Sequence, residues 1–356
     1  MTDGLFDQLV RRVAPLDQTA AASARALQDR LTKPAGSLGQ LEDLGVQLAA
    51  IAGVCPAPVP EPVAVAVFAG DHGVALTGVS PWPQEVTAQM VVNFCEGGAA
   101  INVLARHVGA SVTVVDVGVA TPIATSSPVL QRRTVARGTA NLADGPAMSA
   151  AQVAAALDVG ASVATELVEG GARLLVTGDM GIGNTTSSAA LIAVLTATAP
   201  ESVTGRGTGI DDATLQRKIA VIEGAIGRLS PGATPAQVLA QVGGLEIAAL
   251  AGFIVAGAAA RVPVVLDGVI AVAAAVVAAA WCHDVRGYVI GGHLSREPGA
   301  RVGLDFLGVV PVIDLGLRLG EGSGAALAVP VVQASAKILR EMATFESAQV
   351  THRRDE

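Results

Sequence analysis

Two carboxylates in this 356-residue sequence could do chemistry, because glycines surround each of them. Asp179 lies in the glycine-rich stretch 178–184, and Glu321 lies between two glycines of the stretch 320–324. Glycine lets a backbone turn tightly and lets a ligand approach it closely. A carboxylate repels a phosphate, so we expect Asp179 to face a hydroxyl or a cationic ring. Glu321 either meets a flat substrate or only complements the dipole of the helix that follows it.

Two glycine loops are predicted to bind a phosphate or a carboxylate. In the first, Gly181 and Gly183 precede a helix that begins near Asn184, and the free N–H groups of a helix start attract anions. The second loop, residues 204–211, also precedes a helix, and Lys218 lies two turns into that helix. Ordinary strand-to-helix turns and a solvated lysine are the alternatives, and spacing alone leaves them open.

Other polar residues give weaker signals. The His–Asp neighbours at 71–72 and 283–284 have no partner at metal-ligand spacing, so we interpret them as capping or hydrogen-bonding pairs and expect no metal site. Trp82 is suited to the wall of an aromatic ligand site, although a single tryptophan more often serves packing. The stretch 292–297 places a further polar loop after a predicted strand.

The elements that must position these residues alternate between strands and helices. Five of the six predicted strands end near a charged residue or a histidine; the strands are 63–68, 111–117, 174–177, 262–266, 287–290 and 311–315. The predicted helices are 19–31, 40–52, 85–107, 150–168, 184–195, 212–228, 246–258, 269–281, 300–306 and 325–342. This order predicts an α/β fold with a six-stranded parallel sheet covered on both faces, with its ligands at the carboxyl ends of the strands.

The composition excludes several classes of protein. Hydrophobic residues make up 51% and charged residues 15%, which excludes disorder, and a net charge of −8 without a basic patch excludes a nucleic-acid-binding protein. Arg261 and Asp267 divide the most apolar region, 247–282, into pieces of about 15 residues, shorter than the roughly 20 that span a bilayer. We therefore expect no membrane span. Three scattered cysteines and an N-terminus without a signal-peptide core predict a cytoplasmic protein.

A series of motifs in a fixed order gives a family resemblance. From about Leu31 to Phe345, the chain resembles the nicotinate-nucleotide–dimethylbenzimidazole phosphoribosyltransferases, the enzymes that make the lower nucleotide of cobalamin. A single glycine motif is weak evidence, whereas this many in one order are highly specific. The motifs are KPxGSLGxLE (33–42), GDHG (70–73), VTxQM (86–90), GGAAIN (97–102), GIGNTT (181–186), GRGTGID (205–211) and LRLGEGSGAALA (317–328).

The resemblance implies an activity and an architecture. A phosphoribosyl group would move from nicotinate mononucleotide to 5,6-dimethylbenzimidazole, giving α-ribazole 5′-phosphate and nicotinate with inversion at the sugar and without a cofactor. The family fold is a Rossmann-like sheet domain plus a small helical domain from both chain ends, assembled as a homodimer. Here that implies a sheet domain over 61–320, a helical domain from 1–60 and 321–345, and a polar tail over 346–356.

The same resemblance implies roles for particular residues. Glu321 would be the general base. Ser80, Gln89 and Leu319 would line the benzimidazole pocket. The residues that would hold the nucleotide are Asp179, Gly181, Gly183, Asn184, Gly207, Gly209, Lys218 and Ser295.

Two positions depart from the family pattern. Asp179 keeps the family's carboxylate but is one methylene shorter than the usual glutamate, and Ala300 stands where the family has a histidine. Two other classes of protein follow from the residues alone. A nucleotide-dependent oxidoreductase is disfavoured because the loop reads G-x-x-G-x-G and not G-x-G-x-x-G. A ligand-sensing or carrier domain would need no carboxylate at a reacting centre.

Overall fold

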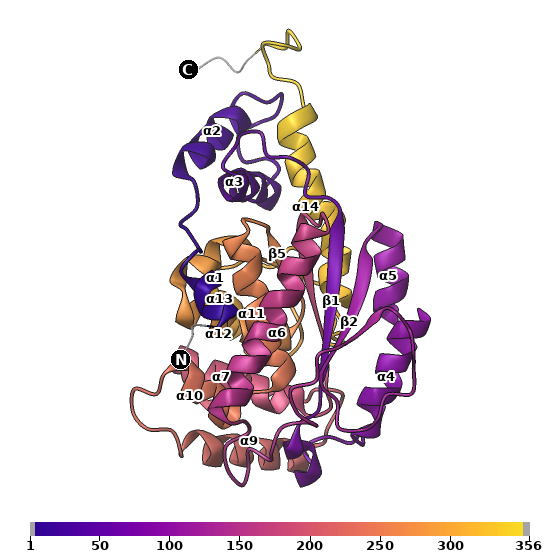
Figure 1. The fold of residues 1–356 in the computed structure, drawn as a ribbon. Helices are drawn as coiled ribbons and strands as arrows, with labels where there is room; N and C mark the ends of the chain where they lie inside the picture. The colour runs from indigo at the N-terminus through magenta and orange to yellow at the C-terminus, as the bar shows by residue number, and fades with distance from the viewer. Residues whose placement is uncertain (1–3, 352–356) are drawn as a thin grey trace.

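A computed structural model describes residues 4–351, and its strands form a single six-stranded parallel sheet (Figure 1). The spatial order β3-β2-β1-β4-β5-β6 reverses between β1 and β4, which is where open α/β sheets bind their ligands. The predicted α/β fold with a parallel sheet is confirmed. The strands are β1 (Val63–Gly70), β2 (Ser111–Gly118), β3 (Leu130–Arg132), β4 (Leu174–Met180), β5 (Val264–Leu266) and β6 (Val289–Gly291).

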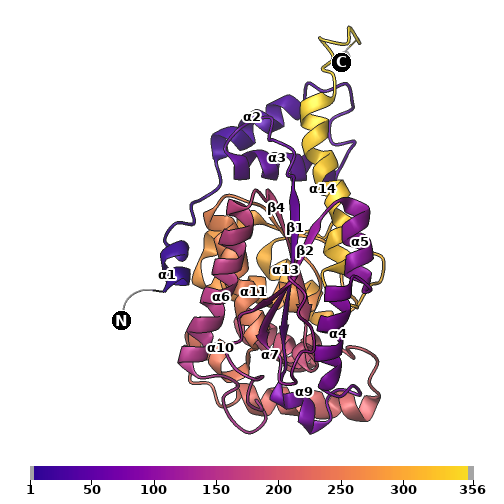
Figure 2. The same cartoon turned by 45° about the vertical axis from the view of Figure 1, so that its right-hand side comes forward.

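Helices cover both faces of the sheet (Figures 1 and 2). One layer, around α6, α11 and α12, packs on one face, and the layer of α4, α5 and α14 packs on the other. The helices are α1 (Leu5–Val10), α2 (Gln18–Gln28), α3 (Gln40–Ala52), α4 (Glu85–Glu96), α5 (Ala100–Val108), α6 (Ala150–Glu169), α7 (Asn184–Thr196), α8 (Pro200–Val203), α9 (Asp212–Ile226), α10 (Pro235–Val242), α11 (Leu245–Ala259), α12 (Val269–Trp281), α13 (Pro298–Leu307) and α14 (Ser323–Glu341), with 3-10 turns η1 (Gly73–Thr77) and η2 (His283–Tyr288).

The two helical layers explain why the strands are apolar throughout. Successive side chains of a strand point to opposite faces. Along β1, Ala66 and Phe68 belong to the core beneath α6 and α11, whereas Val65 and Val67 belong to the core beneath α4 and α14. Both sets are buried, so no position of the strand is left for a polar residue.

One predicted strand is wrong and one was missed. The segment 311–315 forms only an isolated bridge, between Ile313 and His293, because Pro311 has no N–H to donate and the chain turns away at Gly316, whose φ is +66°. The sixth strand is instead β3, which pairs with the edge of β2. Its sequence, Leu130-Gln131-Arg132, is partly exposed and has no apolar run that would predict it.

Several helices also differ from the prediction, among them the short α1 and α8, which were not predicted. The pattern over 85–107 is two helices, because Gly97 ends α4 in a left-handed conformation with φ of +81°. Helix α10 was not predicted. It begins with a capping box in which Thr234 and Gln237 satisfy each other's backbone N–H groups, with Pro235 at its first position.

The two ends of the chain meet beyond the sheet. Helices α2 and α3 lie beside the C-terminal part of α14 in both views, and Leu31 forms a bridge with Thr344 (Figures 1 and 2). The first half of α14 also contacts β4 and β5. The contacts among α2, α3 and the end of α14 fit the small helical domain that we propose from 1–60 and 321–345, whereas α1 and the first half of α14 pack against the sheet domain. These domain bounds stay a proposal, and part of the proposed tail, 352–356, lies outside the described residues.

Helix α6 is the single helix within residues 4–351 that is long and apolar enough to cross a membrane. It packs along α11, and Val153, Ala156 and Leu157 are buried in the core of that layer. These contacts are those of a core helix in a globular fold, so no membrane span is evident.

Candidate functional site

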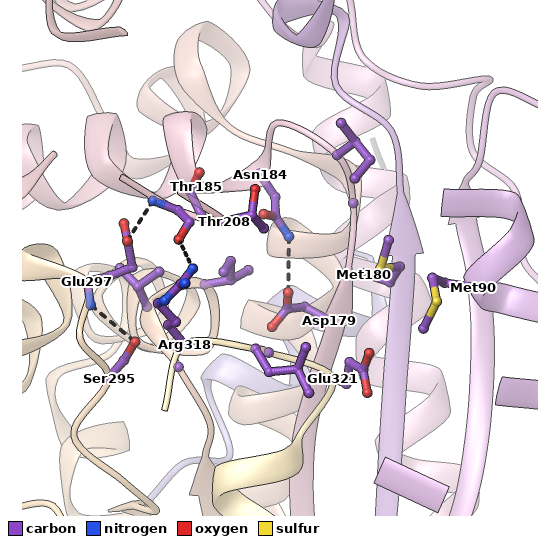
Figure 3. A pocket seen from close by; sticks show the side chains of 18 of the residues that line it. Met90, Asp179, Met180, Asn184, Thr185, Thr208, Ser295, Glu297, Arg318 and Glu321 are labelled. Atoms are coloured by element: carbon purple, nitrogen blue, oxygen red, sulfur yellow. Dashed lines mark hydrogen bonds between the residues drawn. The ribbon is translucent and has the colours of Figure 1, made fainter. Parts of the chain in front are cut away.

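A cavity of about 430 Å³ opens at the carboxyl ends of the strands, beside the switch point between β1 and β4 (Figure 3). Its walls come from the end of β4, the residues that follow β5 and β6, and the loop that precedes α14. Most of its lining is apolar, with a few polar groups, as in small-molecule sites. The apolar side chains are Trp82, Val86, Met90, Met180, Ile182, Val269, Ile270 and Leu319.

Asp179 is the polar group that β4 contributes. The strand continues to Met180, so Asp179 lies within it and not in the following loop as the sequence suggested. Asn184 Nδ2, at the start of α7, donates a hydrogen bond of 3.0 Å to Asp179 Oδ2, and Oδ1 has no partner among the described residues (Figure 3). Burial, followed by the charges of Asp267 and Glu246, raises the pKa of Asp179 well above its ordinary value.

Glu321 reaches the cavity from a left-handed stretch of backbone. Gly320, Glu321 and Gly322 have φ values of +85°, +67° and +93°. This turn lies directly on β4, because a Cβ added to Gly178 would come within 2.6 Å of the Glu321 carbonyl oxygen. Burial raises the pKa of the Glu321 carboxyl from 4.5 to about 7, and its Oε2 has no hydrogen-bond partner in the described part of the chain. A carboxylate with these properties can accept a proton near neutral pH.

The start of α14 is capped by Asp267 and not by Glu321. Asp267 follows β5 and is buried, and it accepts backbone N–H groups from Gly322 at 3.1 Å, Gly324 at 2.8 Å and Ala325 at 3.0 Å. A carboxylate in this place satisfies free N–H groups and complements the helix dipole. The structure therefore gives Asp267 the role that the sequence left open for Glu321.

The second glycine loop is held over the cavity from two sides. Gly207 N–H donates to Glu297 Oε1 at 2.8 Å, and Arg318 Nη1 donates to the Gly207 carbonyl at 2.8 Å (Figure 3). The Glu297 N–H in turn donates to Ser295 Oγ at 3.3 Å. Glu297 and Arg318 were not singled out from the sequence. In the sequence, only the polar stretch 292–297 indicated that this side of the cavity carries functional residues.

Lys218 is not a solvated surface residue. It is 1% exposed, and its Nζ donates to Thr185 Oγ1 at 2.9 Å and to the Gly205 carbonyl at 3.2 Å. Burial lowers the pKa of Lys218 from 10.5 to about 8. Its ammonium group therefore lies between the two glycine loops, where an anion could replace its present partners.

The structure brings most of the predicted site residues together. Those that line the main cavity are Asp179, Gly181, Asn184, Gly207, Ser295, Leu319 and Glu321. Ser80, Gly183 and Lys218 line a smaller adjoining cavity of about 60 Å³, and Gly209 lines a third one on the other side of its loop. Gln89 lines none of these cavities, because it lies on the exposed face of α4 while Val86 and Met90 of that helix face the site.

No group of three or more His, Cys, Asp or Glu side chains within residues 4–351 is arranged to hold a metal ion. The independence of the site from metal stays a prediction. His293 also lines the cavity, and its Nε2 lies 3.5 Å from Asp267 Oδ1. From the sequence, this histidine was visible only as part of the polar loop 292–297.

Comparison with known proteins agrees with this geometry. A Rossmann-like sheet with glycine loops and buried carboxylates at its switch point is an arrangement typical of enzymes that act on nucleotides. A family model described as a phosphoribosyltransferase matches residues 13–350. The chain is a phosphoribosyltransferase, an enzyme that transfers a pentosyl group.

Individual relatives narrow the family further. The nicotinate-nucleotide–dimethylbenzimidazole phosphoribosyltransferase of Salinispora tropica is 55% identical over 98% of this chain and 100% of its own length. The protein of that name from Chloroflexus aggregans is 51% identical, with 99% of each chain covered. The crystal structure of CobT from Thermus thermophilus is 47% identical and has a TM-score of 0.92 over 94% of this chain and 100% of its own. The chain belongs to the nicotinate-nucleotide–dimethylbenzimidazole phosphoribosyltransferase family.

Proposed function

We propose that this enzyme transfers the phosphoribosyl group of nicotinate mononucleotide to 5,6-dimethylbenzimidazole, for the nucleotide loop of cobalamin. A ring nitrogen of the base attacks C1′ of the ribose from the face opposite nicotinate. The C1′–N bond breaks, its electron pair neutralises the pyridinium nitrogen, and nicotinate leaves. The product is α-ribazole 5′-phosphate, with inverted configuration at C1′. The names of the relatives and the order of the shared motifs support this choice of substrates.

Glu321 is the general base of the proposed reaction. As one nitrogen of the imidazole ring forms the bond to C1′, the N–H on the other nitrogen becomes acidic, and transfer of that proton leaves the ring of the product neutral. Glu321 lines the cavity, and its Oε2 has no hydrogen-bond partner within the described residues. Its pKa of about 7 allows it to be ionised and yet basic at neutral pH. This carboxylate is the observation that carries the proposal.

The nucleotide lies against the two glycine loops. Gly181 and Gly207 let the substrate approach the backbone closely, and Lys218 exchanges Thr185 and Gly205 for the 5′-phosphate. Ser295 offers a hydroxyl on the opposite wall. By the family resemblance, the residues that also hold the nucleotide are Gly183, Asn184 and Gly209. Asp179 contacts a ribose hydroxyl.

The base lies in the apolar part of the cavity. Trp82, Met90 and Met180 present flat or adaptable surfaces, and Leu319 closes the same wall from the loop that holds Glu321. Ser80 borders the adjoining cavity. Gln89 is exposed and lines neither cavity, so its place in the acceptor pocket rests on the resemblance alone.

Product analysis tests the proposal. Mass spectrometry of a mixture of enzyme, nicotinate mononucleotide and 5,6-dimethylbenzimidazole should show α-ribazole 5′-phosphate and nicotinate in equal amounts. A panel of other benzimidazoles, purines and phenols, each replacing the base, then ranks the acceptors. Nucleotide that stays intact with every acceptor would overturn the proposal, and tight binding of a reduced nicotinamide cofactor would favour the oxidoreductase instead.

A homodimer and a cytoplasmic location are further parts of the proposal that rest on the resemblance and on the sequence. Analytical ultracentrifugation should give twice the mass of the 35.5 kDa chain. A species with the mass of one chain at micromolar concentration would contradict the dimer.

A further inference from the structure

A buried histidine–glutamate pair lies beneath the glycine loop and lines none of the cavities described above. His72 follows β1 and Glu246 lies in the first turn of α11, and both side chains are fully buried. His72 Nε2 lies 2.6 Å from Glu246 Oε1. On the other side of the ring, His72 Nδ1 lies 3.0 Å from Ser187 Oγ, in the first turn of α7.

The hydrogen-bond partners assign one of the two protons of this pair, the one on His72 Nδ1. Ser187 Oγ is 3.2 Å from the Gly243 carbonyl, which can only accept, so the hydroxyl donates to it. The hydroxyl oxygen is then free to accept from His72 Nδ1–H. With Nδ1 protonated, one further proton lies in the short bond between Nε2 and Glu246, whichever atom holds it. The pair is neutral as a whole, which suits its complete burial.

The His72–Glu246 pair packs against the underside of the first glycine loop, which lines the cavity. A Cβ added to Gly183 would lie 3.2 Å from His72 Cβ, and one added to Gly181 would lie 3.6 Å from Glu246 Oε1. The imidazole ring also needs Gly244, where an added Cβ would clash with His72 Cε1. The ring is therefore packed against the loop on one side and against the start of α11 on the other.

The neighbouring Asp71 holds the same loop by a second route. Asp71 Oδ1 accepts from Thr87 Oγ1 at 2.6 Å, and Thr87 Oγ1 accepts the backbone N–H of Ile182 at 3.2 Å. Asp71 Oδ2 accepts the N–H of Ala120 at 2.8 Å. Two consecutive side chains after β1 thus reach the 181–187 segment at both of its ends, through buried hydrogen bonds.

We propose that His72 is a positioning residue, which together with Glu246 fixes the nucleotide-binding loop by anchoring the first turn of α7 from below. This assignment rests on the proposed function, in which Gly181, Gly183 and Asn184 hold nicotinate mononucleotide. With the loop fixed, the Asn184 side chain keeps its bond to Asp179, and the backbone N–H groups are aligned before the nucleotide arrives. A site prepared in this way binds its ligand without the entropic cost of ordering a loop.

His72→Asn tests the inference, because its amide nitrogen can take the place of Nδ1 toward Ser187 but is too short to reach Glu246. Two readouts are measured on the full chain. Hydrogen–deuterium exchange of the peptide that covers 181–187 reports on the loop whether or not the enzyme has the proposed activity. Calorimetry with nicotinate mononucleotide and no acceptor gives the Kd. His107→Asn, the same substitution at an exposed position of α5, is the control.

We expect His72→Asn to speed exchange in 181–187 and to raise the Kd, and the KM for the nucleotide, by about ten- to a hundredfold, the effect of a small misplacement at a site. The KM for the base and exchange in α2 should stay as in the wild type. A loss of kcat with both KM values unchanged, or faster exchange throughout the chain, would mean that His72 serves only the stability of the fold and would overturn the inference.

Two further outcomes are also decisive. If His72→Asn does not fold, Ser187→Ala, which removes only the contact with Nδ1, takes its place and should give a smaller change in the same two readouts; no change in either would refute the inference. If the wild-type protein fails to bind nicotinate mononucleotide, the proposed function is wrong, while the exchange measurement still decides whether His72 holds the loop.

Discussion

Replacing Glu321 by glutamine separates the chemistry of its carboxylate from its shape. Glutamine keeps the size of the side chain and can form similar hydrogen bonds, but it has no basic site. Because the pKa of Glu321 is about 7, kcat/KM of the wild type should rise with pH through an apparent pKa near that value. In Glu321→Gln this rise of kcat/KM with pH should disappear. Its kcat should fall by about two to four orders of magnitude, the usual contribution of general-base catalysis.

The same substitution should stabilise the fold, with a defined pH dependence. The pKa of Glu321 is about 7 in the folded protein, whereas its ordinary value, 4.5, applies to the unfolded chain. At a pH between these two values, the folded state holds a proton that the unfolded state has lost. Stability that this carboxyl contributes in acid is therefore lost as the pH rises through that range. At about 1.4 kcal/mol for each pKa unit, ionised Glu321 costs the folded state about 3 kcal/mol above neutral pH. Glutamine does not ionise and is free of this cost.

Denaturant unfolding of both proteins at about pH 5 and about pH 8 measures the difference. The free energy of unfolding of Glu321→Gln should exceed that of the wild type by about 2 kcal/mol more at the higher pH than at the lower. Glu341→Gln, the same change at the exposed end of α14, should show neither effect. If the free energies of unfolding of the two proteins differ by the same amount at both pH values, the raised pKa of Glu321 is refuted. If Glu321→Gln turns over at a near wild-type rate, another residue is the general base, and Asp179 is the next to replace.

Three other perturbations follow from the same geometry. Gly183→Val puts a branched side chain where φ is +98° and a Cβ would lie 3.2 Å from His72 Cβ, so the KM for nicotinate mononucleotide should rise by about tenfold or more in steady-state kinetics; an unchanged KM would remove Gly183 from the site. Asp267→Asn removes a charge that raises the pKa of Glu321, so the acid limb of kcat/KM should move to lower pH, and a limb that stays in place would refute this coupling. Chelation with EDTA should leave turnover unchanged, and activity that is lost and then restored by a divalent ion would show that the metal-free prediction is wrong.

The sheet could be predicted where both of its faces are buried and could not where one side is exposed. In β1 and in the first half of β4, helical layers on both sides bury an uninterrupted apolar run, and such runs are visible in a sequence. Strand β3 lies at the edge, where Gln131 and Arg132 are tolerated. The opposite error occurred at Pro311, in an apolar segment that meets only the end of β6. Its composition resembles that of a strand, but its pairing is limited to one parallel bridge between Ile313 and His293.

Local motifs revealed most of the residues that line the cavity, but not Glu297 and Arg318, nor the buried partners that hold these residues in place. Glycines next to a carboxylate are a signal within a few positions, which is why Asp179 and Glu321 stood out. The partner of His72 is Glu246, 174 positions away, and Asp267 reaches Gly322 across 55 positions. Such pairings depend on the order of strands in the sheet and have no fixed spacing. Lys218 was expected near the nucleotide, but its burial depends on the second glycine loop that folds over it.

The backbone around Glu321 favours our proposal that this part of the fold serves chemistry at the expense of stability. Left-handed backbone suits the glycines on either side, but for a residue with a side chain it costs about 1 kcal/mol or more. Glycine would remove that strain at 321, and glutamine would remove the cost of burying a charge, yet this sequence has an acid at the position. Asp267, bonded to three N–H groups at the start of α14, holds the strained turn in place. The backbone and the charge of this side chain both oppose folding, and a buried neighbour nevertheless fixes it beside a cavity. We take this combination as support for the proton-accepting role that we propose for Glu321.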